Sequence, residues 1–217
     1  MKKTNFLIIL AIIFSFSCTS VNYWKVKLEI PGISPVNLDE FKELLITNFF
    51  IEKETKDFNL NKELVDYFSA ELGNFYKGKI NSREITPEKK DMFKEADFWK
   101  NLIPGVKESL FLTGTAEYSK EVRKAILEKS QRSDDFTSSK KGLAERKFYT
   151  LILHLYLIDA HTGKILYDKD FKETRGYENP RQTAQFAFFD LVQQAQVKFF
   201  RNILGIERVE QRYLISD

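Results

Sequence analysis

The sequence predicts an α/β domain of the α+β-like kind, in which a mixed β-sheet of about four to five strands is flanked by three helices. Two observations lead to this fold class. Segments with the period of strands and segments with the period of helices intermix along the chain, without strict strand–helix–strand alternation. One segment, residues 148–158, is apolar on both faces, which is typical of a central strand. A chain of 217 residues that is 43% hydrophobic and 30% charged can bury such a core.

The N-terminus has the pattern of a secretory signal peptide over residues 1–17. A charged start precedes an apolar run at 6–16, and the only cysteine, Cys18, follows shortly after. As a helix, this run would span about 16 Å, which is about half of a hydrocarbon core. The run is therefore too short for a permanent transmembrane helix.

Three interpretations of Cys18 are open: the acylated first residue of a lipoprotein, an incidental residue of a secreted chain, and part of an uncleaved anchor. The stretch that ends at Cys18 resembles a lipobox, with Ser15 and Ser17 at positions where that pattern prefers Leu and Ala or Gly. We favour lipidation, because it explains a single cysteine in an exported chain. Removal of the signal peptide lowers the 34 basic residues to 32, against 31 acidic ones, so attachment to the membrane would depend on acyl chains.

The first half of the mature chain divides into four predicted elements. Residues 18–37 hold the lipidated N-terminus and a first strand, whose alternating apolar residues are Trp24, Val26, Leu28 and Ile30. The single domain begins at residue 38, with a helical turn at Asp39 and a second strand near 45–52. A helix over 60–77 has an apolar stripe formed by Leu60, Leu64, Phe68, Leu72 and Phe75. Thr86 and Pro87 begin the next helix, whose stripe is Met92, Ala96, Trp99 and Ile103.

The second half holds a strand, a charged segment, a hairpin and a helix. A strand at 109–118 is followed by the segment 119–147, and the strands 148–158 and 164–172 form a hairpin. A last helix runs from Asn179-Pro180 to about Leu204, with Gly205 after it. The domain therefore covers 38–205, and the charged segment 206–217 is a surface tail.

The segment 119–147 is predicted to be a long charged loop, with nine basic and five acidic residues. It is either a solvated excursion or an insertion that binds a partner. Its excess of positive charge would steer an acidic partner. The candidate partner-binding residues are Lys129, Arg132, Lys140 and Lys141.

Two short motifs resemble those of a group of exported bacterial lipoproteins. They are Leu110-Phe111-Leu112-Thr113-Gly114 and Asp159-Ala160-His161-Thr162-Gly163. The group includes the curli-secretion channel lipoprotein, the activator lipoprotein of penicillin-binding proteins and the amino-terminal domain of the Tol–Pal propeller protein. The resemblance covers residues 38–204 and implies a mixed sheet flanked by helices, akin to anticodon-binding domains. It also implies a protein that is not an enzyme.

The sequence contains few residues suited to binding a metal or a cofactor. One cysteine and two histidines are too few for a typical zinc site or a disulfide framework, and we expect no metal and no cofactor. His154 is predicted to be a core residue and His161 an exposed turn residue. Asp159 and Thr162 are predicted to close a turn in which Gly163 takes a positive φ. Interspersed charges indicate no nucleic-acid surface.

We therefore expect a non-enzymatic cell-envelope lipoprotein that binds another envelope protein in assembly or transport. Thr19, and not Asp, follows Cys18. By the commonest sorting rule, the resemblance then implies an outer-membrane lipoprotein that faces the periplasm. The alternative is a subunit of an oligomeric secretion pore, and the third interpretation is a hydrolase.

Overall fold

The computed structural model describes residues 22–103, 108–128, 141–177, 179 and 181–216. The chain forms two compact units. Ile33–Gly205 makes the larger one, and the segments up to Gly32 and from Ile206 make the smaller one. Each unit is considered by itself.

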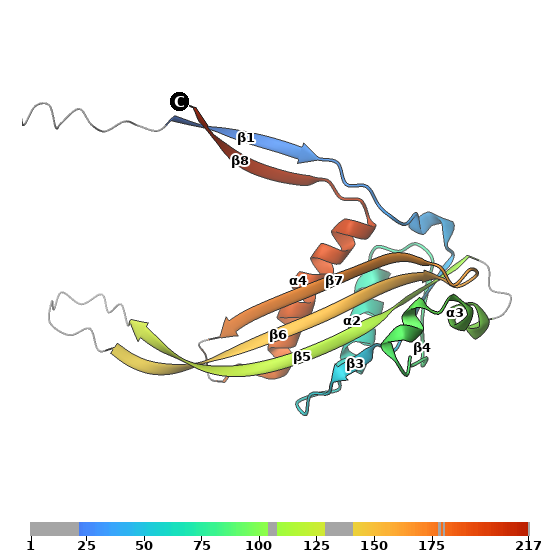
Figure 1. Cartoon of the computed structure of the whole chain (residues 1–217), viewed down its shortest axis with the longest axis horizontal. Helices are drawn as coiled ribbons and strands as arrows, with labels where there is room; N and C mark the ends of the chain where they lie inside the picture. The colour runs from blue at the N-terminus through green and yellow to red at the C-terminus, as the bar shows by residue number, and fades with distance from the viewer. Residues whose placement is uncertain (1–21, 104–107, 129–140, 178, 180, 217) are drawn as a thin grey trace, which may run out of the picture. The chain divides into compact units, whose positions relative to one another are not determined.

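A mixed sheet of six strands forms the centre of the larger unit (Figure 1). Five strands follow the order β4-β2-β5-β6-β7, and β3 adds to β5. The pairs β2–β4, β2–β5 and β3–β5 are parallel, whereas β5–β6 and β6–β7 are antiparallel. The strands are β2 (Glu43–Thr47), β3 (Phe50–Lys53), β4 (Lys79–Arg83), β5 (Ser109–Glu128), β6 (Lys141–Asp159) and β7 (Ile165–Tyr177). The predicted mixed sheet flanked by helices is confirmed, with one strand more than expected.

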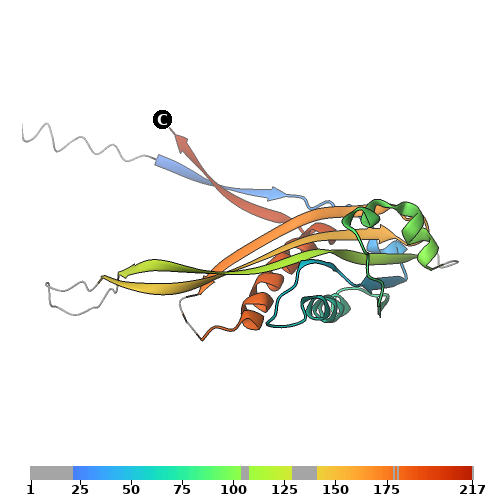
Figure 2. The same cartoon turned by 60° about the horizontal axis from the view of Figure 1, so that its bottom comes forward.

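Helices cover both faces of this sheet, as Figure 2 shows. On one face lie α2 (Leu60–Gly73) and α4 (Ala184–Ile203), and α3 (Ala96–Leu102) lies on the other. Short 3-10 turns, η1 (Leu38–Glu40) and η2 (Lys90–Lys94), precede β2 and α3. Asn59 caps α2 and Thr183 caps α4, because each side-chain oxygen accepts a backbone N–H of the first turn.

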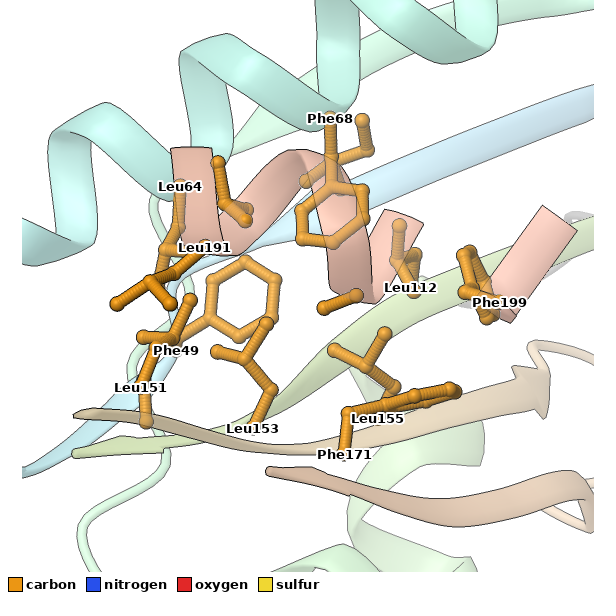
Figure 3. Close-up of a cluster of buried hydrophobic side chains, with 14 of the residues drawn as sticks. Phe49, Leu64, Phe68, Leu112, Leu151, Leu153, Leu155, Phe171, Leu191 and Phe199 are labelled. Carbon is orange, nitrogen blue, oxygen red and sulfur yellow. The ribbon is translucent and has the colours of Figure 1, made fainter. Parts of the chain in front are cut away.

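The main core lies between the sheet and the helices α2 and α4 (Figure 3). From β6 it takes Leu151, Leu153, Leu155 and Leu157, none more than 1% exposed. Phe68 of α2 and Phe199 of α4 meet edge to face between the layers. A smaller core under α3 takes Tyr156 and Ile158 from the opposite face of β6. The central strand predicted from two apolar faces is therefore present.

The segment 119–147 differs from the sequence prediction. The structure extends β5 through Glu128 and starts β6 at Lys141, so the loop can lie only between these ends. The ladder continues because β5 and β6 pair with each other as far as Glu128 and Lys141, although about half of these residues are charged. The strands here depend on cross-strand pairing and not on a hydrophobic period of two.

Two helix boundaries also differ. The segment predicted as one helix from Pro87 to Ile103 is split into η2 and α3, and it buries Phe93 and Trp99, whereas Ala96 is exposed. The helix predicted over 60–77 ends at Gly73, which leaves Phe75 53% exposed. The strand β4 lies in a segment for which the sequence predicts no element.

The smaller unit contains an antiparallel ribbon of two strands. β1 (Asn22–Ile30) pairs with β8 (Arg208–Ser216) over nine residue pairs. The first strand therefore lies where the sequence predicts it. The segment predicted as a surface tail is its partner strand, since Val209, Gln211 and Tyr213 pair with Glu29, Lys27 and Lys25 of β1.

Candidate functional site

A two-stranded arm is the most distinctive surface of the larger unit. Past Glu117, β5 has no further pair with β3, and Lys147↔Tyr177 is the last pair between β6 and β7. Beyond these points, β5 and β6 pair only with each other within the described part of the chain. We call residues 119–128 and 141–147 the hairpin arm. It extends about 30 Å along β5 and leads away from the helices (Figure 2).

The hairpin arm is basic and its described side chains are largely exposed. It carries six basic and three acidic residues. Val122 is 54% exposed and lies opposite Lys147 in the ladder. The open edges on both sides offer backbone hydrogen bonds to another chain. The arm therefore combines an apolar contact, positive charge and free strand edges.

One face of the arm places two arginines opposite each other. Arg123 pairs with Arg146 in the ladder, an arrangement that costs stability unless negative charge lies close by. The Arg123 guanidinium donates to Glu121 Oε2 at 2.9 and 2.6 Å and lies 4.8 Å from the centre of the Phe148 ring. These contacts orient the guanidinium at the surface, where an anionic group can reach it.

The base of the arm is fixed to α4 by tyrosines. Tyr118 donates its hydroxyl hydrogen to the Ala184 carbonyl at 2.7 Å, and Tyr177 donates to the Asp190 carboxylate. Burial raises the pKa of Tyr118 above its ordinary value. The pKa of Tyr177 is also raised, mainly by burial and to a smaller extent by the Asp190 carboxylate. Both hydroxyls therefore remain protonated donors at neutral pH. Arg175 adds an ion pair to Asp190 at 2.6 Å.

His154 lies on the face of β6 that also carries Tyr156, where it is partly exposed to solvent. The prediction that it is a core residue is therefore wrong. The ring nitrogens of His154 lie 2.5 Å from Asp168 and 2.6 Å from Asp170, and its side chain is 27% exposed. The imidazole stacks on Tyr156, with ring centres 4.4 Å apart. Burial, with smaller effects of the two carboxylates, raises the pKa of Tyr156 to about 12. His154 thus joins β6 to β7 on the solvent side.

The turn between β6 and β7 has the side-chain bonds expected of its motif. Asp159 accepts the backbone N–H of His161 at 2.8 Å and the hydroxyl of Thr162 at 2.7 Å. Gly163 has φ +69°, the left-handed region that favours glycine. These contacts give the motif a structural role in closing the hairpin.

The other predicted site residues are not brought together by described contacts. Cys18, Lys129, Arg132 and Lys140 lie outside the described residues, and Lys141 is the first residue of β6. The sequence pattern did not indicate that β6 begins at Lys141.

Two further properties concern only the part of the chain that the structure describes. It contains no group of three or more His, Cys, Asp or Glu residues that could hold a metal ion. None of the helices found there is both long and apolar enough to cross a membrane.

Several solved structures resemble this chain, while no protein-family model and no curated protein matches it. A PelC dodecamer from Paraburkholderia phytofirmans is 10% identical and has a TM-score of 0.40, with 85% of this chain and 98% of that chain covered. Lipoprotein GNA1162 from Neisseria meningitidis is 16% identical, with a TM-score of 0.34 and coverage of 74% and 98%. The LpoB C-terminal domain from Salmonella enterica is 12% identical, with a TM-score of 0.30 and coverage of 61% and 82%.

Lipoproteins are thus among the structures to which the chain is similar. All three TM-scores are below 0.5, so these likenesses carry no conclusion about function.

Proposed function

We propose that this protein is a non-enzymatic lipoprotein of the cell envelope that binds another envelope protein through its hairpin arm. The arm is the observation that carries the proposal. It is a long basic hairpin in which, among the described residues, β5 has no pair with β3 past Glu117 and β6 has no pair with β7 before Lys147, and its base is hydrogen-bonded to α4. An extension of this kind presents a contact surface at a distance from the body of the domain.

The chemistry of the arm favours a partner with an acidic surface. The arm contains six basic residues and three acidic ones, so its net charge is positive. Complementary charge speeds association and selects among partners. Val122 supplies an exposed apolar contact between lysines of the same strand. Lys141 begins β6, and we assign further contacts to Lys129, Arg132 and Lys140 of the segment between the strands.

The proposed location is the outer membrane, facing the periplasm, with attachment through acyl chains on Cys18. Its support is the signal-peptide pattern before the single cysteine and the near-neutral charge of the remaining chain. Stable anchoring by lipids takes more than one acyl chain, which an acylated N-terminal cysteine provides.

Substitution of the cysteine tests the anchor. We expect Cys18→Ala to move most of the protein from the membrane fraction to the soluble fraction of disrupted cells, because the acyl chains are lost. The neighbouring Thr19→Ala variant is the control and is expected to stay with the membranes. Unchanged membrane attachment of Cys18→Ala would refute lipid anchorage at this residue.

Photo-crosslinking in intact cells tests the arm as the binding surface. A photoreactive residue in place of Val122 is expected to give a discrete adduct with one envelope protein, since this side chain is exposed on the arm. Adding Lys120→Glu and Lys124→Glu is expected to lower the yield about tenfold, because like charges then face the acidic partner. The adduct is measured by gel shift and identified by mass spectrometry.

Two controls separate the arm from the rest of the surface. Lys169→Glu with Lys172→Glu reverses two exposed charges on β7 and is expected to leave the yield unchanged. A photoreactive residue at Phe75, which is 53% exposed on the larger unit, should give no such adduct. An adduct from Phe75 and none from Val122 would place the binding surface elsewhere. An adduct only with further copies of this chain would favour the oligomeric pore.

A further inference from the structure

The ribbon of β1 and β8 has the form of an incomplete sheet. Among the residues that the structure describes, β1 pairs with β8 alone and β8 with β1 alone. An isolated pair of strands is at best marginally stable in water, and a third strand or a covering layer is needed for independent stability. An exposed strand edge is also a template for another strand.

The side chains of β1 form an apolar row along one face of the ribbon. Trp24 is 67% exposed, Leu28 41% and Ile30 42%. They share this face with Val26, which pairs with Arg212 of β8, while Lys25, Lys27 and Glu29 lie on the other face. A partner that pairs with the edge of β1 would extend this face and reduce its contact with water.

We propose that the free edge of β1 pairs with β1 of a second copy of the chain, antiparallel and centred on Lys27, to form a four-stranded sheet. This register places Trp24 opposite Ile30 of the other copy and Val26 opposite Leu28. On the other face it places Lys25 opposite Glu29 at two symmetric positions. Lys27 lies opposite Lys27 of the other copy at the axis, so two opposite-charge pairs flank one like-charge pair. Aromatic–branched, apolar and opposite-charge pairs are each favourable across strands.

Other antiparallel registers are less favourable. Centring on Val26 would put Lys25 opposite Lys27 twice, with no opposite-charge pair. Centring on Leu28 would put Lys27 opposite Glu29 twice, but only residues 26–30 of the two β1 strands would overlap, and Lys25 would lie opposite Pro31, which has no N–H to donate to the ladder. Pairing offset by one residue from these registers would put apolar side chains opposite charged ones on both faces. Charge, apolarity and strand overlap together therefore favour a second copy in the register with a two-fold axis at Lys27.

Disulfide formation between two copies of the full chain in detergent tests this register. Both variants carry Cys18→Ala, so the introduced thiol is the only one in the chain. In Lys27→Cys the two thiols meet at the axis, where opposed Cα atoms lie about 4.5–5.5 Å apart, within reach of a disulfide. We expect most of this variant to run as a dimer on a non-reducing gel after mild oxidation.

Gln211→Cys is the matched control, because Gln211 lies directly opposite Lys27 on β8 of the same ribbon. In the proposed sheet the two copies of this residue are three strand spacings apart, about 14 Å, which a disulfide cannot span. It should remain monomeric on the gel. Crosslinking of Gln211→Cys in place of Lys27→Cys would overturn the proposal in favour of pairing through β8. Failure of both variants to crosslink would overturn it as well.

A charge exchange tests the same pairs without cysteine. Lys25→Glu alone, or Glu29→Lys alone, puts like charges opposite each other twice per dimer, and we expect about tenfold weaker dimerisation in sedimentation equilibrium. The double variant Lys25→Glu/Glu29→Lys exchanges the charges in both copies and should restore the affinity. A double variant that is as weak as the single ones, or a native chain that stays monomeric, would contradict the proposal.

Discussion

Replacement of Gly114 by alanine is expected to lower the free energy of unfolding of the Ile33–Gly205 unit by more than about 3 kcal/mol. A Cβ atom on Gly114 would lie 1.9 Å from the carbonyl oxygen of His154 and 3.3 Å from Leu155 Cα. Both are backbone atoms of β6, at the point where Gly114 pairs with Leu155. Because β6 is also paired with β7, it cannot withdraw without breaking ladder hydrogen bonds. Urea unfolding followed by circular dichroism measures the effect.

Gly73→Ala is the matched control for this substitution. A Cβ at Gly73 would meet nothing within 4 Å, and the residue is the last of α2. Alanine loses less chain entropy than glycine on entering a helix, so we expect no loss and a gain of up to about 1 kcal/mol. If Gly114→Ala unfolds at the same urea concentration as the native chain, β5 and β6 do not approach each other as closely as the structure shows.

Steric contacts exclude a side chain at both motif glycines, Gly114 and Gly163. The two positions differ in how far the sequence alone predicts the need for glycine. Gly163 follows Asp-x-x-Thr in a turn, which predicts a positive φ, and the structure has φ +69°. A Cβ there would also lie 2.0 Å from the Ala96 carbonyl, a contact with α3 that the sequence does not reveal. Gly114 lies in an ordinary strand, and only the pairing of β5 with β6 shows why a side chain is excluded.

The same distinction applies to the elements. Local periodicity predicted α2, α4 and the central part of β6, because each buries one continuous apolar stripe or two apolar faces. It failed for the hairpin arm, where cross-strand pairing maintains strands that have little apolar face to bury. It also missed the pairing of β1 with β8, since Asn22 and Ser216 lie at opposite ends of the described chain.

The sequence predicts the positive charge of the candidate site but not its structure as a two-stranded arm. The basic excess of 119–147 is visible in the sequence, and so is the single cysteine. The extension of β5 and β6 into an arm depends on non-local hydrogen bonds, and its attachment to α4 depends on Tyr118 and Tyr177. When the strand pairing is not known, a charged segment of this kind is predicted to be a loop.

Substitution of Trp99 by alanine has the other large expected effect, a loss of about 3–5 kcal/mol in the free energy of unfolding of the larger unit. Trp99 is fully buried and packs against Phe93, Phe98 and Phe111. Its indole N–H donates to the Met92 carbonyl at 3.0 Å, which joins α3 to η2. The core under α3 is small, and Trp99 is its largest side chain, so no neighbour can fill the cavity.

The second tryptophan of the chain provides the control. Trp24 is 67% exposed on β1, so Trp24→Ala is expected to change the unfolding of the larger unit by less than about 0.5 kcal/mol. Because the chain has two tryptophans, this variant also leaves Trp99 as the single indole fluorophore. Its emission should be that of a buried indole and should shift to the red in the same urea transition that circular dichroism detects. If Trp24→Ala lowered the stability of the larger unit more than Trp99→Ala, the core under α3 would not be the element that holds η2 and α3 on the sheet.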